Sequence, residues 1–301
     1  MGVNKSTLHT LEKVKKDVGF SFSKNTTYGL GGKAKVAYYP NSISQAIAVF
    51  DYLTESGQKF VTLGNGSNVL ASDEDYDGAV IVTKNLSGIY RTGENTLFCR
   101  AGTTVAKLLK YCITNGFGGL EYIAGIPATL GGLIYMNGGA GGRYVAENIV
   151  NVKFYDGKIH TYSNKNCRFG NKYSTMRDIN CLVLGAEFRF TSESSENIER
   201  EISAYLERRR FHPNGKSCGC VFKNLSGLGA GKLIDEVGLK GLSVGGATVS
   251  REHANFITNC GGSSADVHNL INEVKRRVFC DTGVLLEEEL VYIGDFNDTV
   301  S

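Results

Sequence analysis

The chain has 301 residues, 42% of them hydrophobic and 21% charged, so neither wholesale disorder nor a fibrous fold is expected. Its 33 basic and 30 acidic side chains nearly cancel, to +3, which gives no argument for a nucleic-acid partner. The length suggests about two domains. Glycine is abundant, at 38 residues against 3 prolines, which indicates tight turns and close approach of the backbone to a ligand.

Residues 1–16 read as a polar, charged helix without the apolar core of a signal peptide, and an apolar run of about 18 residues is absent from the sequence. We therefore expect a cytoplasmic protein that does not enter a membrane. In that compartment the 8 cysteines are expected to be reduced. Cys218 and Cys220 form the only close pair, and zinc sites usually need a second pair or a suitably spaced histidine, so we expect no metal.

The first half of the chain alternates helices and strands. Ser42 begins a helix with a capping pattern, and Thr104 caps another that closes at Asn115-Gly116. Strands are expected at 60–63, 79–83, 149–155 and 182–190.

The polar segment 191–197 is the best internal boundary, because it lacks signals for regular structure and precedes a new helix. The elements expected beyond it are a helix at 198–210, a strand at 220–223, a short helix at 232–237, a strand at 255–258, a long amphipathic helix around 267–278 and a last strand at 285–293. Their order predicts a small mixed α+β domain.

Two glycine segments could bind a ligand. Gly64-Asn-Gly-Ser-Asn68 follows a strand, so its amides could converge on an anion, but it is neither a dinucleotide fingerprint nor a P-loop. The alternative is a plain turn. Residues 119–142 are apolar and rich in glycine, which would let a flat ring or a diphosphate lie against the backbone. The alternative there is a tightly packed buried hairpin.

Longer blocks in order along the chain carry a resemblance. They are G-N-G-S-N-V-L from Gly64, A-G-I-P-A-T-L-G-G from Ala124, C-V-F-K-N from Cys220, A-G-K-L-I-D-E-V-G-L-K-G from Ala230 and L-E-E-E-L-V-Y-I-G from Leu286. With them, the sequence resembles the UDP-N-acetylenolpyruvoylglucosamine reductases, flavoenzymes of peptidoglycan precursor synthesis, over about residues 25 to 294. It resembles their short form, which lacks an extra loop with a substrate-clamping tyrosine.

The resemblance implies an α+β protein. A FAD-binding region of the vanillyl-alcohol-oxidase (PCMH) type would occupy residues 1–192, in lobes of about 1–85 and 86–192. A smaller α/β substrate-binding domain would occupy 193–301, with strand 285–293 contributing to the active site. It also implies non-covalent FAD, NADPH as the reductant, a UDP-sugar substrate and a monomer. Hydride would pass from NADPH to the flavin and then to C3 of the enolpyruvyl ether, yielding UDP-N-acetylmuramate.

The resemblance further assigns residues to the ligands. The cofactor-binding residues would be Gly64, Asn65, Gly66, Ser67, Asn68, Gly125, Ile126, Pro127, Gly131, Gly132 and Asn137. The amides of Gly64 to Asn68 would hold the flavin diphosphate, with Gly66 in close contact. Lys223, Asn224 and Ser174 would contact the substrate.

Three residues occupy the family's catalytic positions. Cys220 stands where the family usually has the serine that protonates C2, and a thiol is mostly protonated at neutral pH and could donate. Glu289 matches the second acid of the family's L-E-x-E close. Lys172 replaces an arginine that contacts the substrate carboxylate, which keeps the charge but loses the planar fork.

Each assignment has a plainer alternative. Cys220 could be a packed residue in a paralogue without activity. The acidic run could be a solvated edge, in which alternation puts Glu287 and Glu289 on one face and Glu288 on the other. Arg168 or Arg177 could supply the charge assigned to Lys172. At the level of function, the alternatives are a flavin-dependent oxidase of a small molecule and a non-catalytic protein that binds FAD or a UDP-sugar.

Overall fold

The computed structural model describes residues 5–225 and 227–296. The chain forms two compact units, each assembled from separate segments. The first unit consists of Met1–Asp17, Val36–Asn65 and Gly78–Arg210, and the second of Val18–Lys35, Gly66–Asp77 and Phe211–Ser301. The predicted N-terminal helix corresponds to α1 (Lys5–Glu12) but ends earlier than expected, because Lys15 and Lys16 begin strand β1 (Lys15–Ser21). The part of that prediction on residues 1–4 lies outside the described residues.

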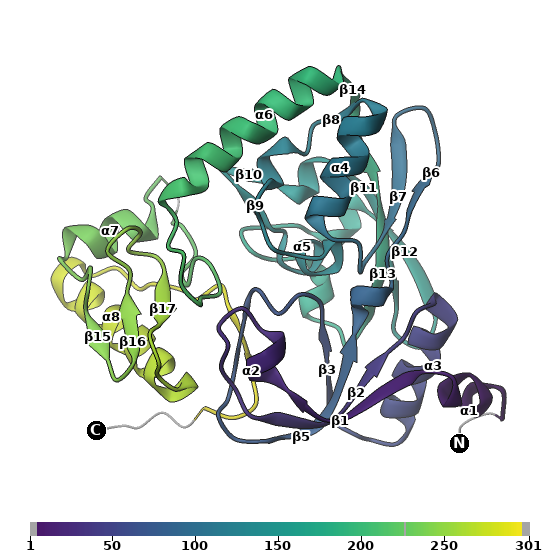
Figure 1. The fold of residues 1–301 in the computed structure, drawn as a ribbon, viewed down its shortest axis with the longest axis horizontal. Helices are drawn as coiled ribbons and strands as arrows, with labels where there is room; N and C mark the ends of the chain where they lie inside the picture. The colour runs from purple at the N-terminus through teal and green to yellow at the C-terminus, as the bar shows by residue number, and fades with distance from the viewer. Residues whose placement is uncertain (1–4, 226, 297–301) are drawn as a thin grey trace. The chain divides into compact units, whose positions relative to one another are not determined.

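The first unit is built around a five-stranded antiparallel sheet of order β12-β11-β13-β7-β6 (Figure 1). Its strands are β6 (Ile89–Arg91), β7 (Thr96–Arg100), β11 (Ile149–Tyr155), β12 (Ile159–Ser163) and β13 (Leu182–Arg189). Two short antiparallel pairs join β8 (Phe117–Gly118) to β14 (Thr191–Ser192) and β9 (Gly139–Ala140) to β10 (Arg143–Tyr144). The other helices are α3 (Ile43–Glu55), α4 (Val105–Asn115), α5 (Leu130–Met136) and α6 (Ser195–Arg208).

A further four-stranded sheet has the order β1-β2-β5-β3. Its strands are β1 (Lys15–Ser21), β2 (Lys33–Tyr39), β3 (Phe60–Leu63) and β5 (Tyr76–Val82), and β3 runs parallel to β5. The chain passes between the two units within β1, β2 and β5.

The second unit contains a three-stranded sheet of order β15-β16-β17 and a parallel pair of β18 with β4. Its elements are α2 (Phe22–Asn25), β4 (Val69–Ala71), α7 (Ala230–Glu236), β15 (Ser243–Val244), β16 (Ala247–Val249), β17 (Ile257–Asn259), α8 (Ser264–Thr282) and β18 (Val291–Ile293). Helix α8 is the amphipathic helix that the sequence predicts, and its buried residues include Val267, Leu270 and Val274.

Three predicted helix ends are confirmed, two by side-chain caps and one by a glycine in the left-handed conformation. The Ser42 hydroxyl accepts a hydrogen bond from Gln45 N at the start of α3, and Thr104 accepts from Lys107 N at the start of α4. Gly116 ends α4 in the left-handed conformation at φ 71°, as expected of a C-cap glycine.

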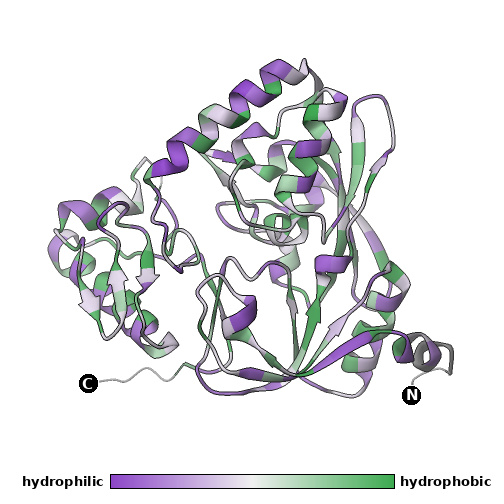
Figure 2. Ribbon diagram, in the orientation of Figure 1, coloured by the Kyte–Doolittle hydropathy of each residue, from purple (hydrophilic) through white to green (hydrophobic). Residues whose placement is uncertain are grey.

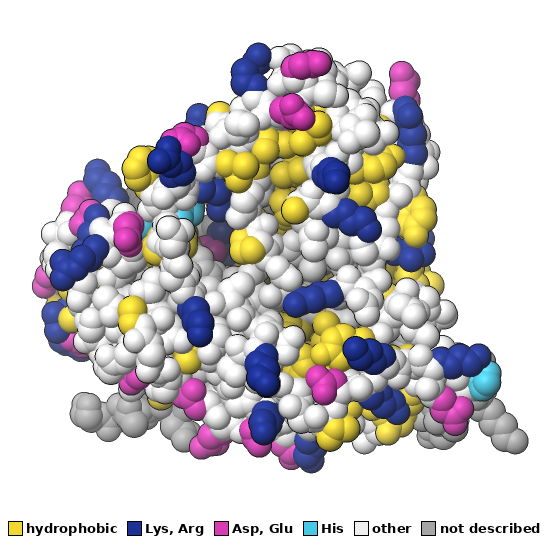
Figure 3. All heavy atoms as spheres, viewed as in Figure 1, with side chains coloured by type: hydrophobic (Ala, Val, Ile, Leu, Met, Phe, Trp, Pro, Cys, Tyr) yellow, Lys and Arg dark blue, Asp and Glu magenta, His cyan; other side chains and the backbone are white. Residues whose placement is uncertain are grey.

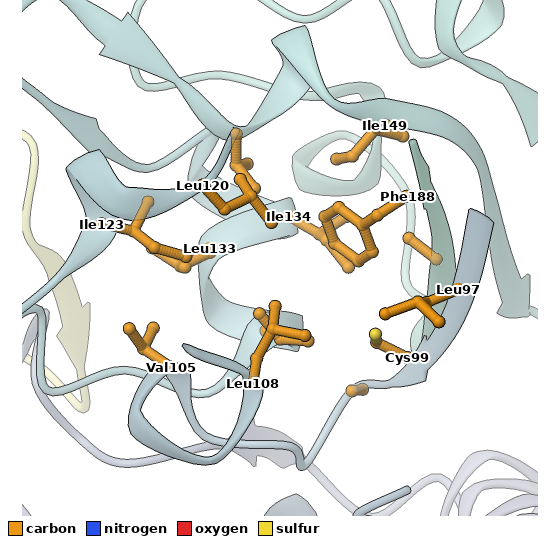
Figure 4. Packing of buried hydrophobic residues seen from close by; sticks show 14 of the residues in the cluster. Leu97, Cys99, Val105, Leu108, Leu120, Ile123, Leu133, Ile134, Ile149 and Phe188 are labelled. Atoms are coloured by element: carbon orange, nitrogen blue, oxygen red, sulfur yellow. The ribbon is translucent and has the colours of Figure 1, made fainter. Parts of the chain in front are cut away.

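The core of the first unit lies between the five-stranded sheet and helices α4 and α5. Figure 4 shows Leu108, Leu133 and Ile134 gathered with Phe188 and Leu97 of the sheet, all of them at most 4% exposed. By contrast, α6 is largely hydrophilic (Figure 2), and Ile198 is its only fully buried residue among those described. The face drawn in Figure 3 carries both basic and acidic side chains, in keeping with the nearly balanced charge.

One predicted strand is replaced by isolated bridges, and another is shorter than expected. Instead of a strand at 220–223, Cys220 forms an isolated bridge with Phe256, and Phe222 forms one with Glu288. The strand expected at 285–293 is regular only at β18. The reason is that the segment changes partner along its length: Glu288 pairs with Phe222, whereas Val291–Ile293 pair with β4. In addition, α6 begins at Ser195 and belongs to the first compact unit, not to residues 211–301.

Candidate functional site

The two glycine segments meet in the first unit. Asn65 Nδ2 donates a hydrogen bond to the carbonyl of Pro127 at 2.8 Å. A Cβ added to Gly64 would lie 2.3 Å from Thr129 Oγ1, so only glycine fits there. Segments more than 60 residues apart in sequence, each predicted to face the cofactor, are therefore in direct contact.

Two features beside this contact point to a ligand. Thr129 is 1% exposed, yet its hydroxyl has no hydrogen-bond partner among the described residues. Gly132 is exposed in α5, and a Cβ added there would meet only Thr129 Oγ1, at 3.8 Å. A helical glycine costs about 1 kcal/mol relative to alanine, and packing within the protein does not require this one. Thr129 thus offers a buried hydroxyl without a hydrogen-bond partner among the described residues, and Gly132 leaves room beside it for close approach of a ligand. Both features fit the flavin cofactor that the resemblance implies.

Other predicted cofactor residues are explained by contacts within the first unit. Gly125 has φ 76°, and a Cβ there would lie 2.9 Å from Arg209 Cδ. A Cβ on Gly131 would lie 3.0 Å from Ala101 Cβ. Ile126 packs against the hydrophobic core. These residues shape the segment, and the structure gives packing reasons for their identity.

Asn137 positions the hairpin that carries Lys172. It caps α5 in the left-handed conformation, at φ 45°, and is 3% exposed. Its Nδ2 donates to Gly170 O at 2.8 Å, and its Oδ1 accepts from Ala146 N at 3.2 Å. Because both ends of the amide are used inside the protein, Asn137 holds a neighbouring segment in place.

Lys172 lies at the tip of this hairpin, where Gly170 and Tyr173 exchange backbone hydrogen bonds of 3.0 and 3.3 Å. It is half-buried and adopts φ 53°, a conformation that costs a non-glycine residue about 1–2 kcal/mol. Arg177 Nη1 donates to the Lys172 carbonyl at 2.8 Å. Ser174 is fully buried and donates to Tyr135 O at 2.8 Å, so its hydroxyl anchors the hairpin.

In the second unit, the rest of the glycine loop joins the segment that carries Glu289. Asn68 Nδ2 donates to the Glu289 carbonyl at 3.0 Å, and Val291 N donates to Asn68 O at 3.0 Å. Gly66 has φ 65°, and a Cβ there would lie 2.4 Å from Asn25 O. The chain's own backbone therefore requires glycine at 66. Ser67 is half-buried in the same loop.

The segments that carry Cys220 and Glu289 are joined by a backbone hydrogen bond in the second unit. Glu289 is 8% exposed, and its amide donates to Val221 O at 2.8 Å. Burial is the main reason that the pKa of the Cys218 thiol is raised to about 12; the hydrogen bond with Tyr28 acts against this rise, and the charges of Glu289 and Cys220 contribute to it. Both candidate catalytic groups therefore lie within electrostatic reach of one buried sulfur. The pKa of Tyr28 is also raised, by burial first and by Cys218 beside it.

The predicted substrate residues Lys223 and Asn224 follow on the same segment. Lys223 Nζ forms an ion pair with Glu287 Oε2 at 3.0 Å. Asn224 Oδ1 accepts from Ala230 N at 3.1 Å, at the start of α7. Glu288, the residue after Glu287, forms an ion pair with Lys275 at 2.8 Å. Glu287 and Glu288 thus differ in partner, as alternation predicts.

Thr129, Tyr28 and the ion pair of Glu287 with Lys223 are not predicted from the sequence. Thr129 stands within the A-G-I-P-A-T-L-G-G block, so its position was a usable signal. For Tyr28 and Glu287 the sequence offers no such signal, because their partners are distant in sequence.

Across the described ranges, there is no cluster of three or more metal-binding side chains, and no helix is long and apolar enough to span a membrane.

Comparison with known proteins assigns both parts of the chain. A family model described as "FAD binding domain" matches residues 34–162, and one described as "UDP-N-acetylenolpyruvoylglucosamine reductase, C-terminal domain" matches residues 212–293. The protein is therefore a flavoprotein, with an FAD-binding domain followed by a smaller C-terminal domain, and the predicted fold class is confirmed.

Curated relatives and a solved structure extend the match to nearly the whole chain. UDP-N-acetylenolpyruvoylglucosamine reductase of Caldicellulosiruptor saccharolyticus is 35% identical over 90% of this chain and 89% of the relative. That of Borreliella burgdorferi is 36% identical, over 89% and 91%. The crystal structure of the Thermus caldophilus reductase has a TM-score of 0.79 at 32% identity, covering 94% of this chain and 99% of that one. The chain belongs to the UDP-N-acetylenolpyruvoylglucosamine reductase family.

Proposed function

We propose that the protein reduces the enolpyruvyl ether of UDP-N-acetylglucosamine enolpyruvate to UDP-N-acetylmuramate, with NADPH as the reductant and FAD as the cofactor. The observation that carries the proposal is the similarity to named reductases along about 90% of the chain. The backbone hydrogen bond from Glu289 to Val221, the residue next to Cys220, supports it, because it joins the segments of the two candidate catalytic residues and the reaction needs a positioned acid.

FAD would be held by the loop 64–68 together with Thr129 and Gly132. Thr129 has a buried hydroxyl without a partner among the described residues, and Gly132 is a glycine that packing within the protein does not require. When bound, this cofactor supplies hydride transfer from NADPH to C3 of the enolpyruvyl group. Asn65 would hold the loop against the segment at Pro127 through its side-chain hydrogen bond. Gly125, Ile126, Gly131 and Asn137 would shape the surrounding backbone.

The chain's own residues would manage charge and the second proton. Cys220 would donate a proton to C2 after hydride arrives at C3, since its thiol is the acid in the position where the family has serine. Lys172 would stabilise the negative charge that spreads into the substrate carboxylate. Glu289 would orient the acid or the carboxylate, and its burial favours a fixed position over a solvated edge. Lys223 and Asn224 would contact the nucleotide-sugar.

Three further assignments belong to this proposal. Residues 1–192 would bind the flavin and residues 193–301 the substrate, although the compact units follow other boundaries. The protein would act in the cytoplasm, where reduced thiols such as Cys220 persist. It would act as a monomer, which sedimentation of the FAD-loaded protein tests directly.

The decisive experiment separates the two halves of the reaction. FAD-loaded protein is reduced anaerobically with NADPH and then mixed with UDP-N-acetylglucosamine enolpyruvate, while flavin absorbance is followed. Rapid bleaching by NADPH and recovery on addition of the enolpyruvyl substrate are expected. A protein that takes up no FAD, or a reduced flavin that oxygen but not the substrate reoxidises, would contradict the proposal.

A further inference from the structure

The segments around Lys223 and Glu287 form a short antiparallel ladder in the second unit. Lys223 N donates to Glu287 O at 2.8 Å, and Glu289 N donates to Val221 O at 2.8 Å. Between them, Phe222 pairs with Glu288. Alternation along an extended segment therefore places the side chain of Glu288 opposite to those of Glu287 and Glu289.

Two ion pairs lie on opposite sides of this ladder. Glu287 Oε2 is 3.0 Å from Lys223 Nζ, and Glu288 Oε1 is 2.8 Å from Lys275 Nζ on α8. The first pair is strongly asymmetric, because the Lys223 side chain is 21% exposed and that of Glu287 is 72% exposed. In the second pair the carboxylate is the buried partner, at 17% against 37%.

The difference in exposure between Lys223 and Glu287 decides which of the two can move away from the ion pair. A lysine side chain that is only 21% exposed has few water molecules around it, so a counter-charge close to its ammonium group is favourable for Lys223. A largely exposed carboxylate loses little when it turns into water, because exposed ion pairs contribute little to stability. An anion with more charge than one carboxylate would therefore take the place of Glu287, while Lys223 stays where its backbone hydrogen bond holds it.

We propose that Glu287 is a removable counter-ion, which occupies Lys223 until the diphosphate of the nucleotide-sugar substrate displaces it. This inference rests on the proposed function, since it assigns Lys223 to the diphosphate of that substrate. Glu287 then sets the affinity for the substrate and takes no part in the chemical step. Glu288 carries the same charge one residue away but faces Lys275, so it has no such effect.

The test compares Glu287→Gln with Glu288→Gln, which remove equal charge from adjacent positions, in the FAD-loaded protein. Affinity for UDP is measured by calorimetry, and KM and kcat with the enolpyruvyl substrate by NADPH oxidation. Glu287→Gln should bind UDP about two- to fivefold more tightly and lower KM by a similar factor, with kcat unchanged. Glu288→Gln should match the wild type in all three. In a Lys223→Met background, Glu287→Gln should have no effect.

Equal effects of the two glutamine variants would overturn the inference, since the effect would then be one of overall charge. Weaker binding by Glu287→Gln would also overturn it and give the ion pair a structural role. A lower KM without tighter UDP binding would refute the assignment to the diphosphate. If the wild type binds UDP but does not turn over the enolpyruvyl substrate, the proposed function fails while the UDP comparison still decides the role of Glu287.

Discussion

Replacing Gly132 with alanine should stabilise the protein without cofactor and weaken FAD binding. The added Cβ meets only Thr129 Oγ1, at the ordinary contact distance of 3.8 Å, so it conflicts with no described atom of the protein. Alanine is favoured over glycine in a helix by about 0.5–1 kcal/mol, which corresponds to a rise in Tm of about 1–3 °C. A methyl group inserted into a close ligand contact costs about 1–3 kcal/mol, or roughly 5- to 150-fold in Kd.

The assay is fluorescence titration of the cofactor-free protein with FAD, paired with thermal unfolding in its absence. Gly131→Ala is the matched control, because its Cβ would lie 3.0 Å from Ala101 Cβ and 3.2 Å from Ala101 O. That variant should lower Tm, since the conflict lies within the protein. A Gly132→Ala protein with raised Tm but an unchanged Kd for FAD would refute the placement of the flavin beside Thr129.

Two further outcomes are expected. Lys172→Met should slow reoxidation by the enolpyruvyl substrate by about 10²–10³ and leave reduction by NADPH nearly normal, because only the former step develops charge on the substrate carboxylate; a larger effect of Arg168→Met in the same stopped-flow assay would transfer the role to Arg168. Because burial raises the pKa of Cys218 to about 12, the thiol is almost entirely protonated at pH 8, and its alkylation by iodoacetamide, followed by mass spectrometry, should be slow at pH 8 and accelerate as the pH rises; labelling of Cys218 as fast as that of the exposed Cys260 would contradict this.

Local rules predicted the parts of the fold that local contacts determine. The caps at Ser42 and Thr104 and the glycine at 116 were predictable, because a capping bond joins residues three or four positions apart. The contact between Asn65 and Pro127 was anticipated only indirectly, since both segments were assigned to one ligand. Family resemblance, not periodicity, supplied that assignment.

Contacts between distant residues explain what the sequence did not reveal. The resemblance predicts that Gly66 is glycine because it lies in close contact with the flavin diphosphate, whereas in the structure Asn25 O already excludes a Cβ at this position. Likewise, α6 belongs to the first unit because Ser195 Oγ donates to Ile113 O at 2.6 Å, and Leu206 packs on Gly125. Neither neighbour is visible from composition or spacing, so a boundary chosen at a polar segment separated elements that pack together.

The most direct test of the central claim is the single-turnover reoxidation of NADPH-reduced enzyme by the enolpyruvyl substrate in Cys220→Ala and Cys220→Ser. A positioned acid contributes about 10²–10⁴ in rate, so the alanine variant should slow by that factor while NADPH still reduces its flavin. The serine variant, which restores the residue usual in the family, should retain substantial activity. In the wild type, activity should fall as pH rises and the thiol ionises, and serine should shift that fall to higher pH. An alanine variant within a few-fold of the wild type would contradict the account and leave Cys220 as a packed residue beside another proton source.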